Sequence, residues 1–284
     1  TYLTEAEAEA AGNEVLQFTD GSTSADNIVA EATDGAIEIN NWFVDQVFRD
    51  VTADLAEEMH ISLEEAEKKV YSGGYKIYTT MDPEIQELAE SVYADRGNLN
   101  NLTSRNGQPI QSGITVMDPY TGDIVAIVGQ MGEKESNLLW SYAADKHQVG
   151  SSMKPLTAYA PAIDSGAVTP GTTFDDYPVE TMNGNYWPKN SPQRYRGFTS
   201  VASGIQNSIN TIAVQTLMAG GVAEAFAFAT EKLCLDLEPE DMDRSPLGLG
   251  GLHRGLSTIE MAAAYSFFVN KGVYNEPRTY LRVE

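Results

Sequence analysis

The chain has 284 residues, of which 42% are apolar, so it is long enough to bury one large core or two smaller ones. Its net charge of −23 argues against nucleic-acid binding, because phosphate groups require a basic surface. The acidity is uneven: residues 1–100 carry 22 acidic and 5 basic side chains, whereas residues 101–284 carry 19 and 13. The sequence therefore divides into an acidic approach segment and a nearly balanced globular body.

The acidic segment predicts helices separated by a polar stretch. A capping box begins a short helix at residues 4–12, and the Gly- and Ser-rich residues 13–40 predict a loop. Residues 40–59 place Trp, Phe, Val and Leu side chains on one helical face. Ser62 and Glu65 form a second capping box, which predicts another short helix.

The following residues predict the first strands. Residues 75–80 alternate as a strand, and the next helix has Asp82 as its N-cap and Pro83 as its first residue. Residues 113–130 predict a hairpin around the turn "DPYTGD". Its second strand, at 124–128, is apolar without alternation, which predicts that both of its faces are covered.

Helical patterns dominate the rest of the chain, at 151–165, 199–219, 221–233 and 257–271. Strands followed by several helices predict an α+β fold, with helices packed on an antiparallel sheet. Two strands are too few for that many helices, so we expect the sheet to be incomplete and further strands to lie beyond residue 284.

Cysteine content and hydropathy say less about the fold and the location of the protein. The single Cys234 excludes an internal disulfide and is expected to be a small buried apolar residue. No apolar run is long enough to span a bilayer. Because the chain begins at Thr1 and stops within a regular pattern, we expect it to be an excerpt of a longer protein.

The stretch "GSSMKP" carries the first chemical signal. Ser151 and Lys154 are three residues apart, so a helix that begins there presents both on one face. The helix dipole favours alkoxide character at the serine, and a buried lysine with a lowered pKa could accept the serine proton. Gly150 allows the backbone to approach a substrate closely. A capped helix without catalysis explains the same residues, so a partner motif is needed.

The stretch "QNSINTIAVQ" supplies that partner. Ser208 and Asn210 lie at the junction of two helical stretches, where a hydroxyl could relay a proton and an amide could hold a substrate. A second Ser-x-Asn, Ser104 to Asn106, lies in a run of turn-forming residues and is interpreted as a surface loop.

"GSSMKP" followed by "SIN" resembles the penicillin-binding and serine β-lactamase superfamily, with its Ser-x-x-Lys, Ser-x-Asn and Lys-Thr-Gly motifs. The segments "GGYKIYTTMDPEIQELAE", "MDPYTGDIVAIVGQ", "YWPKN" and "STIEMAAAYSFFVNKGVYNEP" resemble, in order, the transpeptidase domain of bifunctional (class A) penicillin-binding proteins. The opening "YLTEAEAEAA" is similar to the segment that follows their glycosyltransferase domain. The resemblance implies a linker region at 1–75 and the N-terminal part of a transpeptidase domain at 76–284.

The resemblance also implies residue roles. Ser151 would be the acylated nucleophile, Lys154 its base, Ser208 the proton relay to the leaving amine, and Asn210 a ligand of the donor peptide. Gly150 and Asn190 would contribute to substrate binding. The implied reaction is D,D-transpeptidation of D-Ala-D-Ala stem peptides of peptidoglycan, inhibited by β-lactams and needing no cofactor and no metal.

The family resemblance further implies a location and partners. The full-length protein is expected at the extracytoplasmic face of the bacterial membrane, held by an N-terminal anchor that this chain lacks, with other cell-wall synthesis proteins as possible partners. No Lys-Thr-Gly or Lys-Ser-Gly occurs in the 284 residues. Because that motif completes the oxyanion hole in the family, we expect the chain to acylate slowly or not at all. A D,D-carboxypeptidase, a β-lactamase and a non-catalytic β-lactam sensor remain alternatives.

Three other features have plainer interpretations. "GLGGLHRG" at 248–255 lacks the strand and the Lys-Ser/Thr ending of a phosphate loop, and predicts a close backbone approach instead. His147 is expected to be a loop residue rather than a base. Asp175, Asp176 and Glu180 fall in a Gly- and Pro-punctuated loop and are expected to be solvated.

Overall fold

The structure is a computed structural model, and it describes residues 39–99, 102–182 and 184–284. The helix predicted at 4–12, and all of the loop predicted at 13–40 except its last two residues, lie outside this range. The chain has two compact units. Unit 1 comprises the residues up to Ala144 together with Asn275–Glu284, and unit 2 comprises Asp145–Tyr274. The mixed helix and sheet class predicted from the sequence is confirmed.

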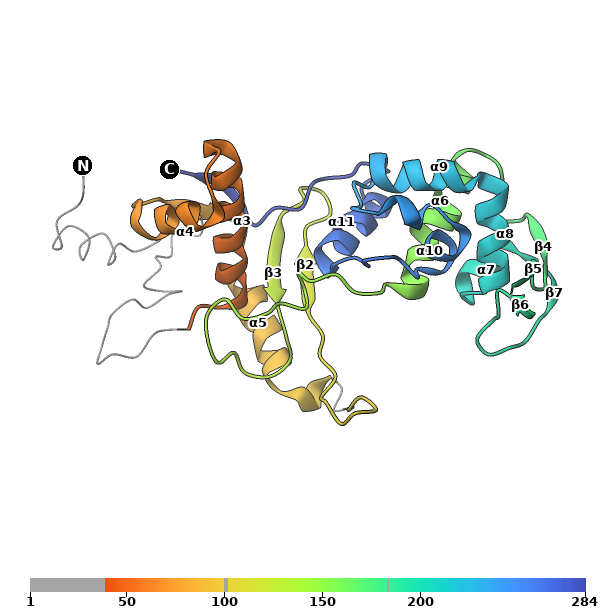
Figure 1. Cartoon of the computed structure of the whole chain (residues 1–284), viewed down its shortest axis with the longest axis horizontal. Helices are drawn as coiled ribbons and strands as arrows, with labels where there is room; N and C mark the ends of the chain where they lie inside the picture. The colour runs from red at the N-terminus through yellow and green to blue at the C-terminus, as the bar shows by residue number, and fades with distance from the viewer. Residues whose placement is uncertain (1–38, 100–101, 183) are drawn as a thin grey trace. The chain divides into compact units, whose positions relative to one another are not determined.

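Unit 1 is built from helices and two small antiparallel sheets (Figure 1). Its elements are α3 (Trp42–Met59), α4 (Leu63–Ser72), β1 (Ile77–Thr79), α5 (Pro83–Ala94), η1 (Arg96–Asn98), β2 (Ile114–Met117), β3 (Ile124–Val128) and β8 (Tyr280–Val283). Strand β1 pairs with β8, and β2 pairs with β3. Both predicted N-caps are confirmed: Ser62 forms a reciprocal capping box with Glu65, and Asp82 accepts hydrogen bonds from the first turn of α5.

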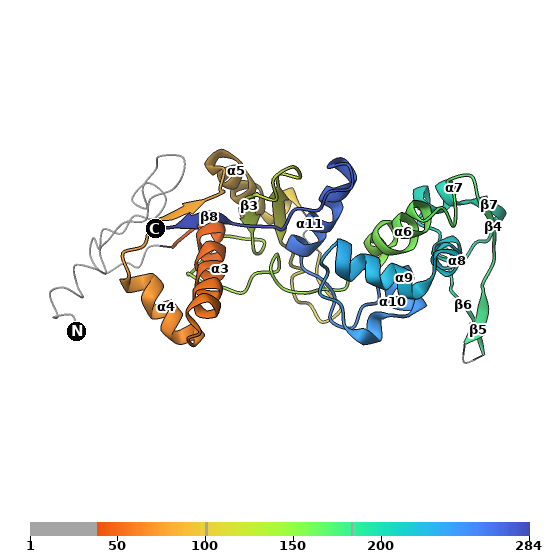
Figure 2. The same ribbon diagram turned by 90° about the horizontal axis from the view of Figure 1, so that it is seen from above.

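Strand β3 is the buried centre of unit 1. Helices α3 and α5 pack against it, and Figures 1 and 2 show α5 beside β3. Side chains from 124 to 128 are buried almost without interruption, as their continuous apolar pattern predicts. The buried side-chain amide of Gln86 donates to the C=O of Ile127 and accepts from its N–H, at 2.9 Å each. It therefore satisfies both backbone groups of Ile127, as a neighbouring strand would.

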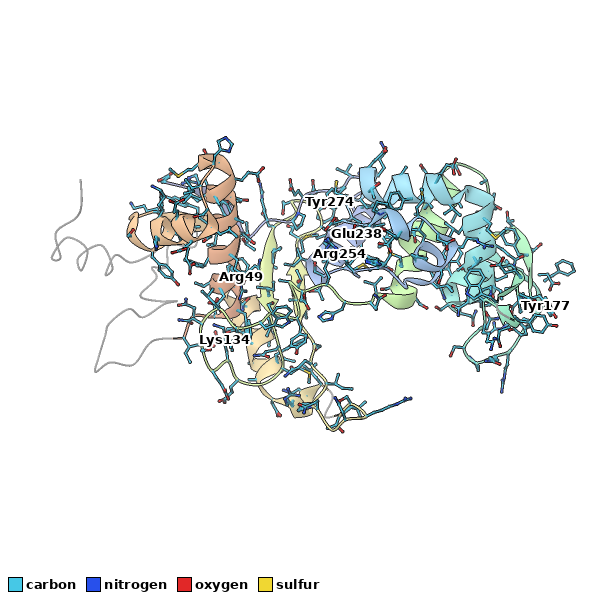
Figure 3. The ribbon with its side chains drawn as sticks, viewed as in Figure 1. Arg49, Lys134, Tyr177, Glu238, Arg254 and Tyr274 are labelled. Carbon is cyan, nitrogen blue, oxygen red and sulfur yellow. The ribbon has the colours of Figure 1, made fainter. Side chains whose placement is uncertain are left out.

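Helix α3 also holds the loop that follows β3. Asp45 accepts a 2.8 Å ion pair from Lys134, and both side chains are buried. Arg49 reaches the carbonyl of Leu139 at 2.7 Å, and Figure 3 marks Arg49 and Lys134. Because α3 and α4 contact each other and α3 packs on β3, the helices of the predicted linker region share one unit with the first hairpin of the predicted transpeptidase domain.

Unit 2 is mainly helical with two small two-stranded sheets (Figures 1 and 2). Its helical elements are η2 (Gly150–Ser152), η3 (Pro155–Tyr159), α6 (Ala160–Asp164), α7 (Val201–Gln206), α8 (Asn210–Gly220), α9 (Val222–Ala227), η4 (Phe228–Lys232), η5 (Pro239–Asp241), α10 (Arg244–Leu249) and α11 (Thr258–Val269). Strand β4 (Thr173–Asp176) pairs with β7 (Gly197–Ser200), and β5 (Glu180–Met182) pairs with β6 (Asn185–Trp187). None of these four strands was predicted.

The helix that begins at Gly150 is not regular. It opens as a 3₁₀ turn, and it is a π-helix from Pro155 to Tyr159. Pro161 explains the change, because a proline ring clashes with the carbonyl four residues earlier and cannot donate a hydrogen bond. The N–H of Ala160 accordingly bonds to the carbonyl of Pro155, five residues back. This π register admits the proline without ending the helix.

Helix α8 and the π-helix lie in one core of seventeen buried apolar residues, which also includes side chains from α6, α9, α10 and α11. Cys234 is a correction to the sequence analysis, since it is exposed and has a φ of 51°. Its neighbours Leu233 and Leu235 occupy the core instead.

No single helix in the described part of the chain is long and apolar enough to cross a membrane. The segments Asn210–Gly220 and Val222–Lys232 reach the required length and apolarity only together, and they meet at 94°. Both segments contribute buried side chains to the core of unit 2.

Candidate active site

Lys154 is the centre of the candidate site. Only 2% of this residue is exposed, although it carries an ammonium group. Its Nζ donates to three oxygens: the Ser208 carbonyl at 2.8 Å, the Ser208 hydroxyl at 3.0 Å and Asn210 Oδ1 at 2.5 Å. Ser208 and Asn210 follow Lys154 by 54 and 56 residues in the sequence. The Ser-x-x-Lys and Ser-x-Asn motifs therefore meet at the Nζ of Lys154.

Burial lowers the pKa of Lys154 to about 8, even though three oxygen acceptors favour its charged form. At pH 7.4 a pKa of about 8 leaves roughly a fifth of the lysine neutral, against about a thousandth for an ordinary lysine. The site therefore provides an amine that can accept a proton near neutral pH.

Ser208 occupies a tight turn between α7 and α8. Its φ of 52° is in the left-handed region, which is uncommon for any residue other than glycine. This conformation interrupts the helical pattern predicted over 199–219, and it presents both the carbonyl and the hydroxyl of Ser208 to Lys154. Strained backbone of this kind occurs preferentially at functional sites.

Asn210 begins α8 and connects the lysine to a second loop. Its Oδ1 accepts from Lys154, while its Nδ2 donates to the Lys189 carbonyl at 2.7 Å. Since the amide nitrogen is held by Lys189, the amide oxygen must face Lys154. The backbone of Lys189 is thus a functional group that the sequence analysis did not identify.

A buried network fixes the loop that carries Lys189. The Asn190 amide donates to Asp176 Oδ1 at 2.7 Å and to the Arg194 carbonyl at 3.0 Å, and its oxygen accepts from Thr211 N at 3.2 Å. Both amide hydrogens of Asn190 and one acceptor site of its oxygen are therefore used within the protein itself. This geometry favours a positioning role over the direct substrate contact predicted for Asn190.

Asp176 was expected to be solvated, and the structure corrects this. It is 1% exposed and accepts from Asn190, from the Thr211 hydroxyl at 2.5 Å and from the Arg196 N–H at 2.9 Å. The signal was present in the sequence, because alternation along β4 places Asp176 on the same face as Phe174. Asp175 is exposed as expected, and Glu180 is half-buried beside Arg244 at 3.0 Å.

Ser151 lies within the first turn of the helix that carries Lys154. Gly150, with a φ of 53°, makes the sharp entry into this turn. Ser151 is exposed, and its hydroxyl has no hydrogen bond to Lys154 or to any other residue that the structure describes. Catalytic hydrogen bonds are often formed only once a substrate is bound, so an exposed Ser151 hydroxyl that lacks this bond is compatible with the predicted role.

The segment that leads into Ser151 is braced by the glycine-rich residues 250–256. The N–H of Gly150 donates to the Gly250 carbonyl at 3.2 Å, and His147 pairs as a β-bridge with Leu256. A Cβ on Gly250 would lie 1.9 Å from the Gly150 carbonyl oxygen. The close backbone approach predicted for this stretch is therefore confirmed.

Two further contacts complete the surroundings of Ser151. The Tyr265 hydroxyl of α11 donates to the Ser152 carbonyl at 2.7 Å. An open groove of about 460 Å³ lies beside this turn, between residues 147–149 with Ser152 on one side and residues 256–265 on the other. The half-exposed His147 imidazole lines this groove and lies 3.3 Å from the Asp145 carboxylate.

Comparisons with known proteins identify the family that this chain resembles. Residues 112–233 match the family model described as penicillin binding protein transpeptidase domain. Penicillin-binding protein 1A of Clostridium botulinum is 32% identical over 253 residues, covering 85% of this chain and 30% of the relative. Penicillin-binding protein 1A of Clostridium acetobutylicum is 35% identical over 260 residues, covering 85% and 31%. The chain thus spans about a third of the length of these curated relatives.

The fold has solved counterparts. The structure of PonA1 from Mycobacterium tuberculosis in complex with penicillin V superposes with a TM-score of 0.66 at 23% identity, covering 84% of this chain and 62% of that chain. The fold and the family match define a transpeptidase domain of the penicillin-binding type. Residues 112–233 are identified by this match as part of a penicillin-binding protein transpeptidase domain, and the identity to the clostridial proteins extends the similarity over 85% of the chain, which confirms the resemblance described above.

The Gly250 contact can be tested by substitution. We expect Gly250→Ala to lower the free energy of unfolding by about 2 kcal/mol or more, because the left-handed φ of 76° disfavours a Cβ and the new methyl group collides with the Gly150 carbonyl. Thermal unfolding followed by circular dichroism measures this. Gly251→Ala is the control, since its Cβ would meet nothing closer than 3.9 Å. Equal stability of the two variants would contradict the proposed brace.

The Asp176 network allows a second test. Asp176→Ala leaves the donors of Asn190, Thr211 and Arg196 without their acceptor, and we expect it to cost about 3 kcal/mol of unfolding free energy in urea. Asp175→Ala removes the neighbouring exposed carboxylate and is expected to change stability by less than about 0.5 kcal/mol. A Asp176→Ala variant as stable as Asp175→Ala would show that the network does not hold the loop.

Proposed function

We propose that this chain is a serine D,D-transpeptidase, which forms an acyl-enzyme at Ser151 from D-Ala-D-Ala stem peptides of peptidoglycan and reacts with β-lactams at the same serine. The observation that carries the proposal is the buried Nζ of Lys154, three residues after Ser151 and hydrogen-bonded to Ser208 and Asn210. The family match to penicillin-binding transpeptidase domains supports the reaction class.

Acylation begins with proton transfer. Neutral Lys154 takes the proton of the Ser151 hydroxyl, and the serine oxygen forms a bond to the carbonyl carbon of the penultimate D-Ala. The carbonyl oxygen becomes an oxyanion, for which the N–H of Ser151 is one donor. Gly150 contributes by leaving this approach free of a side chain.

Collapse of the tetrahedral intermediate breaks the C–N bond to the terminal D-Ala. The Ser208 hydroxyl, 3.0 Å from Lys154, passes a proton from the lysine to the leaving amine. An amine of a second stem peptide then attacks the ester, loses its proton to Lys154, and releases Ser151 as the hydroxyl. Asn210 would bind the donor peptide, with Lys189 fixing the orientation of its amide.

The proposed location follows from the proposed substrate. We place this activity on the outer face of the bacterial cell membrane, in a longer protein with its own membrane anchor and with other cell-wall synthesis proteins as partners. We propose residues 76–284 as the transpeptidase part and residues 1–75 as the region linking it to a glycosyltransferase domain.

Labelling with a fluorescent penicillin tests the proposal. We expect a covalent adduct on the Ser151 peptide by mass spectrometry and none in Ser151→Ala, whereas Ser152→Ala, which alters the neighbouring exposed hydroxyl, retains it. Because no Lys-Thr-Gly is present to complete the oxyanion hole, labelling should be about 100-fold slower than in a relative that has this motif.

The outcome of a chase separates the related activities. Label that persists supports a transpeptidase, and cross-linking of added stem peptides then separates it from a sensor. Rapid loss of label indicates a hydrolase. Failure to label after prolonged exposure, or label that survives Ser151→Ala, would refute the assignment of Ser151.

The pH dependence of acylation follows from Lys154. Because burial lowers its pKa to about 8 and only the neutral amine accepts a proton, the acylation rate should rise from pH 6 to a plateau above about 9. Stopped-assay labelling across this range measures the profile. Lys154→Arg should not label at any of these pH values, since a guanidinium stays protonated. Lys232→Arg changes an exposed lysine and should keep the wild-type profile. A profile without an inflection near 8 would exclude Lys154 as the base.

A further inference from the structure

Three tyrosine rings cluster on the surface of unit 2. Tyr177 follows β4, Tyr186 is in β6 and Tyr195 precedes β7. The Tyr177 ring centroid lies 6.1 Å from that of Tyr186 and 5.8 Å from that of Tyr195. The residues are 52%, 60% and 39% exposed, and Figure 3 shows Tyr177 pointing outward from the β4–β7 region labelled in Figure 1. Packing of the core therefore does not explain this cluster.

Phe198 extends the aromatic surface. It lies on β7 opposite Asp175 of β4, and it is 85% exposed, the highest value among the exposed large apolar residues. Scattered exposed apolar residues are ordinary, but three neighbouring tyrosine rings, with a strongly exposed phenylalanine on the following strand β7, make a surface of the kind that binds ligands.

The same region has a positive charge in an acidic chain. Residues 183–223 contain Lys189, Arg194 and Arg196 and no Asp or Glu, although the whole chain has a net charge of −23. All three cationic side chains are exposed, whereas the nearby Glu180 is paired with Arg244. Asp175 is the one exposed carboxylate that we find on the β4–β7 sheet in the described residues. This surface is therefore suited to an anionic ligand.

The patch is continuous with the candidate active site. The guanidinium of Arg196 donates to Asn207, the residue before Ser208, at 3.3 Å. The carbonyl of Lys189 accepts from Asn210. A substrate held by Ser208 and Asn210 would thus lie next to Arg196 and the Lys189 loop, and Arg196 directly follows Tyr195 of the cluster.

We propose that Tyr177, Tyr186, Tyr195 and Phe198, together with Arg196 and Lys189, form a subsite for the sugar-linked anionic part of the substrate strand. The ligand class is an anionic glycopeptide: exposed ring faces pack on the apolar faces of sugar rings, phenol hydroxyls bond to sugar hydroxyls, and the cations pair with carboxylates. This inference rests on the proposed transpeptidase function, because it concerns the portion of the same substrate that lies beyond the reacting D-Ala-D-Ala end.

The test compares binding of two soluble probes by isothermal titration calorimetry: a disaccharide–pentapeptide and the same pentapeptide without sugar. We expect Tyr177→Ala to weaken binding of the glycopeptide about 10-fold and that of the free peptide much less. Arg196→Ala should weaken both probes at low ionic strength and less in high salt. The controls are Tyr120→Ala and Arg105→Ala, which remove an exposed tyrosine and an exposed arginine from unit 1 and should bind as the wild type does.

Three outcomes would overturn the inference: equal affinity of Tyr177→Ala and wild type for the glycopeptide, equal losses for both probes in Tyr177→Ala, or a loss of penicillin V uptake as large as the loss of glycopeptide affinity. The last result would assign the rings to the side chain of the β-lactam. Failure of the proposed function is distinguishable, because it appears as absence of label at Ser151 in the wild type, whereas the subsite is measured by affinity alone.

Discussion

Burial of the Lys154 ammonium is the constraint on which the site depends. An isolated charge in a protein interior costs several kcal/mol unless it loses its proton or gains oxygen acceptors. Here three acceptors come from a turn of only three residues, because the left-handed Ser208 directs its carbonyl and hydroxyl to the same side as Asn210 Oδ1. Burial lowers the pKa of Lys154 more than the acceptors raise it, so that the pKa is about 8. This value suits a group that accepts a proton at neutral pH.

The turn at residues 208–210 is held by groups that do not contact Lys154. Asn210 is oriented by the Lys189 carbonyl, and the loop of Lys189 is anchored through Asn190 to Asp176. Asp176 has only neutral hydrogen-bond donors as partners, from the backbone of Arg196 and the side chains of Asn190 and Thr211. Such a carboxylate organises three segments at once: a strand, the Lys189 loop and the start of α8. The oxygens that bind Lys154 are therefore positioned by a network and not by a single contact.

The sequence predicted which residues meet at Lys154 better than it predicted the elements that hold them in place. Spacing alone placed Ser151 and Lys154 on one helical turn, and the junction at Ser208 was visible between two apolar helical patterns. The pairing of Lys154 with Ser208 and Asn210 came from the family resemblance, since no local pattern links residues so far apart. The π-helix at Pro155–Tyr159 was not predicted, because a proline inside a helical pattern indicates an irregularity without specifying its hydrogen-bond register. Short strands such as β5 and β6 were missed because three residues carry too little alternation.

One loop serves both the base and the proposed glycopeptide subsite. Its backbone holds Asn210 through the Lys189 carbonyl and its Asn190 side chain is buried, while the side chains of Tyr195 and Arg196 are exposed. Substitutions that move this backbone, such as those at Asp176, disturb both functions together and cannot separate them. Truncation of the exposed side chains leaves the carbonyl of Lys189 in place. Only substitutions of the exposed side chains of this loop can therefore separate the proposed recognition of the glycopeptide from the proposed role of Lys154. Substitutions in the buried part of the loop affect both.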